Sequence, residues 1–313
     1  MSLKTSVITS LIWKFLERIG TQGVSFIVAI VLARLLSPAD FGLIAIVTVF
    51  VTMANVFVQS GLNTALIQKK NADNLDFSTV FFSCLALAAV LYMGLFFSAP
   101  FIAEFYNNQS ELVPVIRVLG LMLPLGALNS IQEAYVARNM MFKKLFYRSV
   151  GAVIPAGIIG VVCAYLGFGI WSLVAQQLSN AFLICVIMWF TVKWRPSLAF
   201  SFERWKGLFS FGWKLLCSSL LDTFYYNIRD LVIGKLFTPA DLGFYNRGDQ
   251  FPKLIITNIN ASIQSVLLPS LSTVQDDRVR LKALARRSIK TSSFLILPMM
   301  AGLAALAQPL TLV

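Results

Sequence analysis

Charged and polar side chains recur at three- and four-residue steps inside two long apolar stretches of this sequence, one near its start and one in its second half. Such steps place side chains on one face of a helix. The two faces consist of Lys14, Arg18, Thr21/Gln22 and Ser25, and of Lys214, Ser218, Asp222, Tyr225/Tyr226 and Arg229. Charges in apolar surroundings are costly, so each is a candidate for function.

Two neighbouring stretches carry similar polar faces. They consist of Thr48, Thr52, Asn55 and Gln59, and of Asn246, Gln250, Lys253, Thr257, Asn260 and Gln264. Four such helices facing one another would line a water-filled cavity with a net basic charge. Such a cavity suits phosphate or pyrophosphate, because Arg and Lys bind these groups by charge-assisted hydrogen bonds. The candidate binding residues are Lys14, Arg18, Lys214, Arg229, Arg247 and Lys253. Asp222 is the candidate partner for a coupling ion or proton.

These charges also have structural interpretations. Lys14 lies near a helix end, from which a lysine can reach the membrane interface. Glu17 is one turn from Lys14 and can pair with it. Asp222 and Arg229 are two turns apart and can belong to separate pairs. The basic residues are therefore a binding hypothesis as a set, and each one has a structural alternative.

The sequence offers few residues for catalysis or metal binding. The chain has no histidine, which excludes imidazole bases and histidine-ligated metals. Its four cysteines lie in apolar runs without metal-ligand spacing. We expect no cofactor, no metal and no enzymatic activity.

The composition predicts an all-α polytopic membrane protein. The chain is 58% hydrophobic and 13% charged, with mean hydropathy +0.76, whereas soluble domains carry about 25% charged residues. Its apolar runs have the length of membrane-spanning helices and lack the alternation of strands. The nine predicted spans are 7–36, 40–66, 78–103, 112–137, 149–166, 170–192, 208–237, 241–268 and 291–313.

The distribution of basic residues orients these spans. Most lysines and arginines fall at the N-terminus and in the loops after even-numbered spans, whereas the loops 104–111 and 167–169 contain none. The positive-inside rule then predicts a cytoplasmic N-terminus. Much of the net charge of +12 is thereby explained by topology, and we expect no nucleic-acid partner.

A repeated motif divides the chain. Residues 37–42 read Ser-Pro-Ala-Asp-Phe-Gly and residues 238–243 read Thr-Pro-Ala-Asp-Leu-Gly, while Trp-Lys occurs at both 13–14 and 213–214. Ser or Thr before Pro, with Asp three residues later, predicts a capped helix start. We expect a six-span lobe over 1–194, a cytoplasmic linker over 195–207, and a partial second lobe over 208–313 that is truncated after three spans.

These motifs resemble the polysaccharide-transporter family, which includes bacterial O-antigen and colanic-acid flippases. The resemblance rests on the duplicated [Arg/Lys]-Leu-x-[Ser/Thr]-Pro-Ala-Asp-[Phe/Leu]-Gly turn, on Phe-Tyr-Asn-Arg at 244–247 and on Val-Leu-Leu-Pro-Ser-Leu at 266–271. The superfamily also contains multidrug extruders and the lipid II flippase. Arg18, Lys214 and Arg229 match in kind the cations that meet pyrophosphate in such folds.

The resemblance implies two six-helix lobes around a central cavity that work by alternating access. The expected substrate is an oligosaccharide on undecaprenyl pyrophosphate, moved from the cytoplasmic to the periplasmic leaflet of the bacterial inner membrane. The expected partners are this lipid-linked oligosaccharide, membrane lipids and, as a further candidate, the polysaccharide polymerase machinery.

Two other functions stay open. A multidrug/cation antiporter of the same superfamily would need a net acidic, aromatic cavity, and the basic excess disfavours it. A membrane polysaccharide polymerase would need a large outward loop with catalytic residues, whereas the longest predicted outward loop is 104–111.

Overall fold

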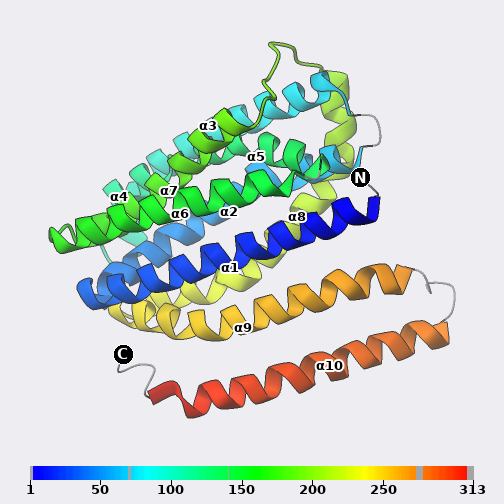
Figure 1. The fold of residues 1–313 in the computed structure, drawn as a ribbon. Helices are drawn as coiled ribbons and strands as arrows, with labels where there is room; N and C mark the ends of the chain where they lie inside the picture. The colour runs from blue at the N-terminus through cyan, green and yellow to red at the C-terminus, as the bar shows by residue number, and fades with distance from the viewer. Residues whose placement is uncertain (1–2, 70–71, 140, 273–277, 309–313) are drawn as a thin grey trace. The chain divides into compact units, whose positions relative to one another are not determined.

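The computed structural model describes residues 3–69, 72–139, 141–272 and 278–308, and every regular element within these ranges is a helix (Figure 1). The ten helices in chain order are α1 (Leu3–Leu35), α2 (Pro38–Gln68), α3 (Asn74–Phe105), α4 (Leu112–Leu119), α5 (Met122–Arg138), α6 (Phe142–Tyr165), α7 (Ile170–Thr191), α8 (Phe202–Leu236), α9 (Pro239–Ser272) and α10 (Arg278–Ala305). The predicted all-α class is confirmed.

The chain forms two compact units, 1–243 and 244–313. In the first unit, α6 packs along both α1 and α7, and α2 packs along both α8 and α5. Figure 1 shows this unit as a bundle of long helices running roughly side by side. The second unit contains α9 from Phe244 onward and α10.

Six candidate membrane spans lie in the first unit within the described ranges: 15–35, 38–67, 74–105, 112–138, 143–165 and 170–191. They correspond to the first six spans predicted from the sequence. Helices α8, α9 and α10 occupy the positions of the last three predicted spans but carry more polar and charged residues. Such helices are suited to wet or protein-lined surfaces.

The fourth predicted span is interrupted, because α4 ends at Leu119 and α5 begins at Met122. Pro124 lacks a backbone N–H, so it cannot bond to the carbonyl of Gly120. That carbonyl instead accepts from the amide of Leu123 at 3.0 Å. The interruption follows directly from a proline placed one turn after a glycine.

Both repeated turns form the predicted capping boxes. Asp40 donates its amide to the hydroxyl of Ser37 at 3.3 Å, and the carboxylate of Asp40 accepts from the amide of Ser37 at 3.0 Å. Thr238 and Asp241 repeat these two bonds at 3.2 and 3.0 Å. Each cap satisfies N–H groups that a helix start otherwise leaves unpaired.

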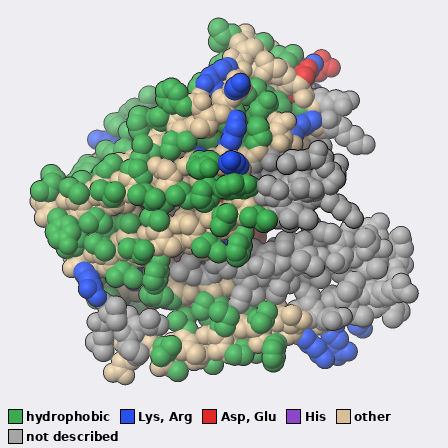
Figure 2. Space-filling view, viewed as in Figure 1, with side chains coloured by type: hydrophobic (Ala, Val, Ile, Leu, Met, Phe, Trp, Pro, Cys, Tyr) green, Lys and Arg blue, Asp and Glu red, His purple; other side chains and the backbone are tan. Residues whose placement is uncertain are grey.

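The outside of the first unit is largely apolar. Figure 2 shows hydrophobic side chains spread over the face in view. Phe97 and Phe101 on α3 and Phe190 on α7 are exposed by 69%, 72% and 85%. Large exposed apolar residues on long apolar helices are what lipid-facing surfaces require.

Candidate functional site

The two copies of the repeated turn lie against each other. A Cβ atom added to Gly42 would fall 1.7 Å from the carbonyl oxygen of Pro239, and one added to Gly243 would fall 1.9 Å from that of Pro38. The contact is reciprocal, since the glycine of each copy meets the proline of the other. Only glycine permits so close a backbone approach.

Further along α2, a second close contact joins it to α8. A Cβ on Gly61 of α2 would lie 2.6 Å from the carbonyl oxygen of Gly212 of α8, and one on Gly212 would lie 2.8 Å from the carbonyl oxygen of Gly61. Between these levels, Gly234 of α8 faces the side chain of Ile46. The contact between α2 and α8 is therefore backbone to backbone at Gly61 and Gly212, and glycine to side chain at Gly234.

The predicted cations of the first unit lie on exposed helix surfaces. Arg18 on α1 is exposed, as are Lys214, Asp222 and Arg229 on α8. At a rise of 1.5 Å per residue, Lys214 and Arg229 are about 22 Å apart along the helix axis. The side chain of Lys14 lies outside the described residues. The prediction that these residues bind substrate is not tested by this arrangement.

The other two predicted cations belong to the second unit. Lys253 forms an ion pair of 2.5 Å with Asp249 one turn earlier, and its side chain is 51% exposed. Arg247 donates to the side-chain oxygen of Gln250 at 3.2 Å. The side chains of Asn260 and Gln264, which continue the predicted polar face, lie outside the described residues.

The polar face of α2 is divided. Asn55 and Gln59 bond to each other at 3.2 Å, and both amides lie against Gly126 of α5, where a Cβ would be 3.0 and 2.9 Å away. Thr52, which lies between Thr48 and Asn55 on the same polar face, is exposed. Part of the predicted cavity face thus serves packing within the first unit.

A buried charge network was missed by the sequence reasoning. Arg148 of α6 pairs with Glu133 of α5 and lies 3.9 Å from Glu17 of α1. Glu17 also accepts a 2.7 Å hydrogen bond from the hydroxyl of Ser149. The signal in the sequence is the pair of opposite charges, Glu133 and Arg148, on either side of the turn between α5 and α6.

Basic side chains hold helix ends together at the end of the bundle where α2 finishes and α3 begins. Arg138 donates to the carbonyls of Leu66 at 3.1 Å and Lys69 at 2.6 Å. Lys144 donates to the last carbonyl of α7, that of Thr191, at 2.7 Å. These cations donate hydrogen bonds to carbonyls that helix C-termini leave unpaired.

The segment between α7 and α8 and the first turn of α8 are both fastened to the start of α3. Arg204 pairs with Asp73 at 2.5 Å and lies 3.3 Å from Asp76, which is also bound by Lys69 at 2.7 Å. Hydrogen bonding from Arg204 lowers the pKa of Asp73 below its usual value. The hydroxyls of Ser78 and Ser197 meet at 3.0 Å.

Sequence comparison places these features in a family. The family model for polysaccharide biosynthesis proteins matches residues 31–313, which is most of the chain. The chain belongs to this polysaccharide biosynthesis protein family. The resemblance stated from the motifs is thereby confirmed.

Named relatives agree with this assignment. The chain is 29% identical over 301 residues to the succinoglycan biosynthesis transport protein ExoT of Rhizobium meliloti (strain 1021), covering 96% of this chain and 61% of the relative. It is 24% identical over 310 residues to the lipopolysaccharide biosynthesis protein WzxC of Escherichia coli (strain K12), covering 97% and 62%. This member of the family thus spans about three fifths of the length of these relatives.

Solved structures show the same fold. The lipid II flippase MurJ in an inward closed conformation matches with a TM-score of 0.71 at 13% identity, over 97% of this chain and 66% of that structure. An inward-facing multidrug resistance MATE family transporter matches with a TM-score of 0.64 at 14% identity, over 95% and 70%. Both are helical membrane transporters of known fold, and this polysaccharide biosynthesis protein shares their architecture.

Proposed function

We propose that this polysaccharide biosynthesis protein acts in a flippase that moves an undecaprenyl-pyrophosphate-linked oligosaccharide from the cytoplasmic to the periplasmic leaflet of the bacterial inner membrane. The observation that supports this most directly is the set of exposed cations, Arg18 on α1 and Lys214 and Arg229 on α8. Exposed arginine and lysine on long helices of a membrane protein are costly unless they meet water or an anionic group. A pyrophosphate headgroup supplies the charge that they would bind.

The spacing of the cations indicates more than one binding position. Lys214 and Arg229 are about 22 Å apart along α8, which is further than one pyrophosphate reaches. In the repeat, Lys214 of α8 corresponds to Lys14 of α1, which is one helical turn before Arg18. We infer that the headgroup binds first at the level of Arg18 and Lys214, and later at Arg229.

The reciprocal turn contact is the proposed closed end of the pathway. Gly42 and Gly243 allow the two capped turns to lie in close backbone contact. Separation of the start of α2 from the start of α9 would break this contact. Alternating access would require the contact to open after the headgroup has crossed. The predicted cytoplasmic N-terminus places this end on the periplasmic side, and the basic end with Arg138 and Lys144 on the cytoplasmic side.

The domain limits proposed from the repeat fit this scheme. The first lobe would cover 1–194, the linker 195–207 and the helices of the second lobe 208–313. Helix α8 packs along α2 in the first unit, as a helix at the boundary between two lobes would do. Lys14, Arg247 and Lys253 remain proposed members of the binding set.

Energy coupling is assigned to Asp222, which is exposed on α8 between the two cationic levels. Moving one elementary charge through 100 mV is worth about 2.3 kcal/mol, so a single coupled ion or proton can bias transport. In this proposal Asp222 binds that ion while the headgroup lies at one level, and releases it after the headgroup moves.

The test is complementation of cells that lack the protein. If the proposal holds, lipid-linked oligosaccharide accumulates in the cytoplasmic leaflet and the unchanged protein removes it. Arg18→Glu and Arg229→Glu should abolish this rescue at normal membrane abundance. Lys206→Glu, an equally exposed cation in the first turns of α8, is the matched control and should rescue fully. Absence of accumulation in the deleted cells would overturn the flippase assignment.

A further inference from the structure

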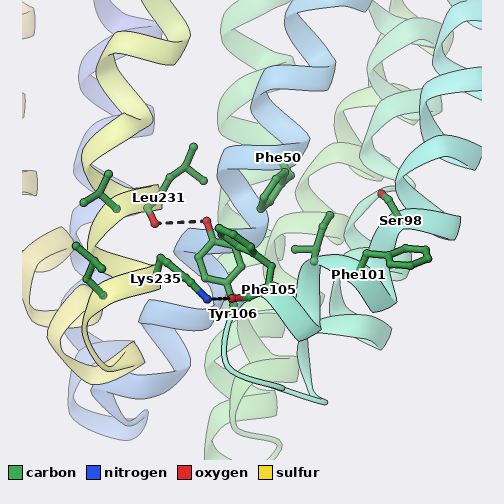
Figure 3. A pocket seen from close by; sticks show the side chains of 10 residues that line it. Phe50, Ser98, Phe101, Phe105, Tyr106, Leu231 and Lys235 are labelled. Atoms are coloured by element: carbon green, nitrogen blue, oxygen red, sulfur yellow. Dashed lines mark hydrogen bonds between the residues drawn. The ribbon is translucent and has the colours of Figure 1, made fainter.

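A pocket of about 610 Å³ opens on the surface of the first unit between α2, α3 and α8 (Figure 3). Its walls are almost entirely hydrocarbon and aromatic. They consist of Phe50, Ser98, Phe101, Ile102, Phe105, Tyr106, Leu231, Val232, Lys235 and Leu236. The volume lies in the range of small-molecule sites.

The pocket is open toward the apolar outside of the bundle. Phe101 and Leu236 at its mouth are exposed by 72% and 70%. It lies at the end of α3, which has the length and composition of a membrane span, and we take the medium at its mouth to be lipid. An apolar cleft that opens into a bilayer is filled most favourably by a hydrocarbon chain.

The aromatic floor is held in place. Tyr106 is only 2% exposed and donates its hydroxyl to the carbonyl of Leu231 at 3.4 Å. Its ring meets Phe50 edge-on at 6.3 Å and Phe105 edge-on at 5.2 Å. Because the tyrosine hydroxyl is already bonded to α8, the floor presents mainly ring surface to the cleft (Figure 3).

One cation stands at the rim. Lys235 is the penultimate residue of α8, and its amine lies 4.4 Å from the centre of the Phe105 ring. The amine also donates to the carbonyl of Phe105, in the last turn of α3. An ammonium group has three donors, so two N–H directions are available beyond this bond. None of the ten lining residues is acidic, which leaves the site with a positive charge.

We propose that this pocket binds an anionic phospholipid, with one acyl chain in the cleft and the phosphate on Lys235. The apolar walls recognise the chain, and the lysine selects a headgroup of net negative charge. A bound lipid would contact α3 and α8 together, and therefore the first lobe and the first helix of the proposed second lobe. This site is separate from the cations at Arg18, Lys214 and Arg229, so it does not depend on the proposed flippase activity.

The experiment is native mass spectrometry of the full chain with added phosphatidylglycerol, phosphatidylethanolamine or phosphatidylcholine. The expected result is retention of one phosphatidylglycerol in preference to both net-neutral lipids. Lys235→Gln should weaken that retention about five- to tenfold, the scale of one charge-assisted contact. Lys235→Arg should keep it.

Two further variants separate the headgroup from the chain. Ile102→Trp fills the cleft and should reduce retention of all three lipids. Lys193→Gln removes an exposed lysine near the opposite end of α3, beyond the end of α7, and should change nothing. The lipid comparison on the unchanged chain needs no variant, so it remains decisive even where a substitution lowers the yield.

Several results would overturn the proposal. Equal retention of the anionic and the two net-neutral lipids would remove the role of Lys235, as would full retention by Lys235→Gln. Displacement of phosphatidylglycerol by an equimolar polyprenyl phosphate would assign the pocket to a carrier lipid instead. Failure of these lipid measurements would leave the complementation result for the flippase unaffected, so the two hypotheses are separable.

Discussion

Trp194 donates a 2.8 Å hydrogen bond from its indole nitrogen to the side-chain oxygen of Asn74. This bond joins the segment after α7 to the first residue of α3, positions far apart in the sequence. The same indole packs against Phe77 and Phe81 at centroid distances of 5.9 and 6.1 Å. This contact thereby attaches the beginning of the proposed linker to α3 of the proposed first lobe.

Trp194→Phe tests this connection. Phenylalanine keeps most of the ring packing and loses the N–H donor, so the free energy of unfolding should fall by about 1 kcal/mol. Thermal unfolding in detergent measures the change. Trp171→Phe, at an indole that is 40% exposed, is the control and should have little effect. Equal loss in both variants would show that the Asn74 bond contributes nothing specific.

Asp73→Asn tests the charge pairing beside it. Arg204 lowers the pKa of Asp73 in the folded protein, so the pairing stabilises above the unfolded aspartate pKa of about 3.9 and is lost as pH falls through the lowered folded value. Stability of the unchanged protein should therefore fall more steeply between pH 5 and pH 3 than that of Asp73→Asn. Asparagine can still cap the N-terminus of α3, so the comparison reports the effect of the carboxylate charge alone.

Both partners of this pair are partly exposed, at 36% for Arg204 and 52% for Asp73, so the effect should be small and weakened by salt. Arg204→Gln should flatten the same part of the pH profile. Measurement of unfolding across pH at low and high salt checks this. An unchanged pH slope in Asp73→Asn would refute the assignment.

Gly42→Ala tests the reciprocal turn contact. The added methyl group would collide with the carbonyl of Pro239, which must move, at a cost of about 1–3 kcal/mol in the closed arrangement. Gly243→Ala should act in the same direction against Pro38. Reactivity of a cysteine introduced at Thr238 should rise as the turns separate.

Gly23→Ala is the matched control for these two variants, because nothing lies within 4 Å of its added Cβ. It should stabilise α1 by up to about 1 kcal/mol through helix propensity alone. If Gly42→Ala behaved like Gly23→Ala, with no change in cysteine reactivity, the close contact between the turns would not exist in the membrane.

Arg148→Gln tests the buried network of α1, α5 and α6. Removing the guanidinium leaves Glu17, whose side chain is only 10% exposed, without the cation that lies 3.9 Å away. Loss of one partner of a buried pair typically costs about 3 kcal/mol or more. Thermal unfolding should show a large loss, whereas Lys206→Gln, at an exposed cation in the first turns of α8, should show almost none.

The local features of this protein were determined by the sequence. Continuous apolar runs set the long helices, because a bilayer requires backbone groups to be paired within each segment. The Ser37 and Thr238 caps followed from residue types at fixed short offsets. Helical periodicity also predicted that Lys214 and Arg229 share one face of α8, and both side chains are exposed.

Only the tertiary structure decided which helices meet. No periodicity shows that Gly42 faces Pro239, or that Asn55 and Gln59 turn toward Gly126 of α5, since a stripe defines a face and not its neighbour. The expected pairing of Glu17 with Lys14 falls outside the described residues, and the structure brings Glu17 to Ser149 and near Arg148 of α6. Partners across helices depend on crossing position and register, which are set by packing of the whole bundle.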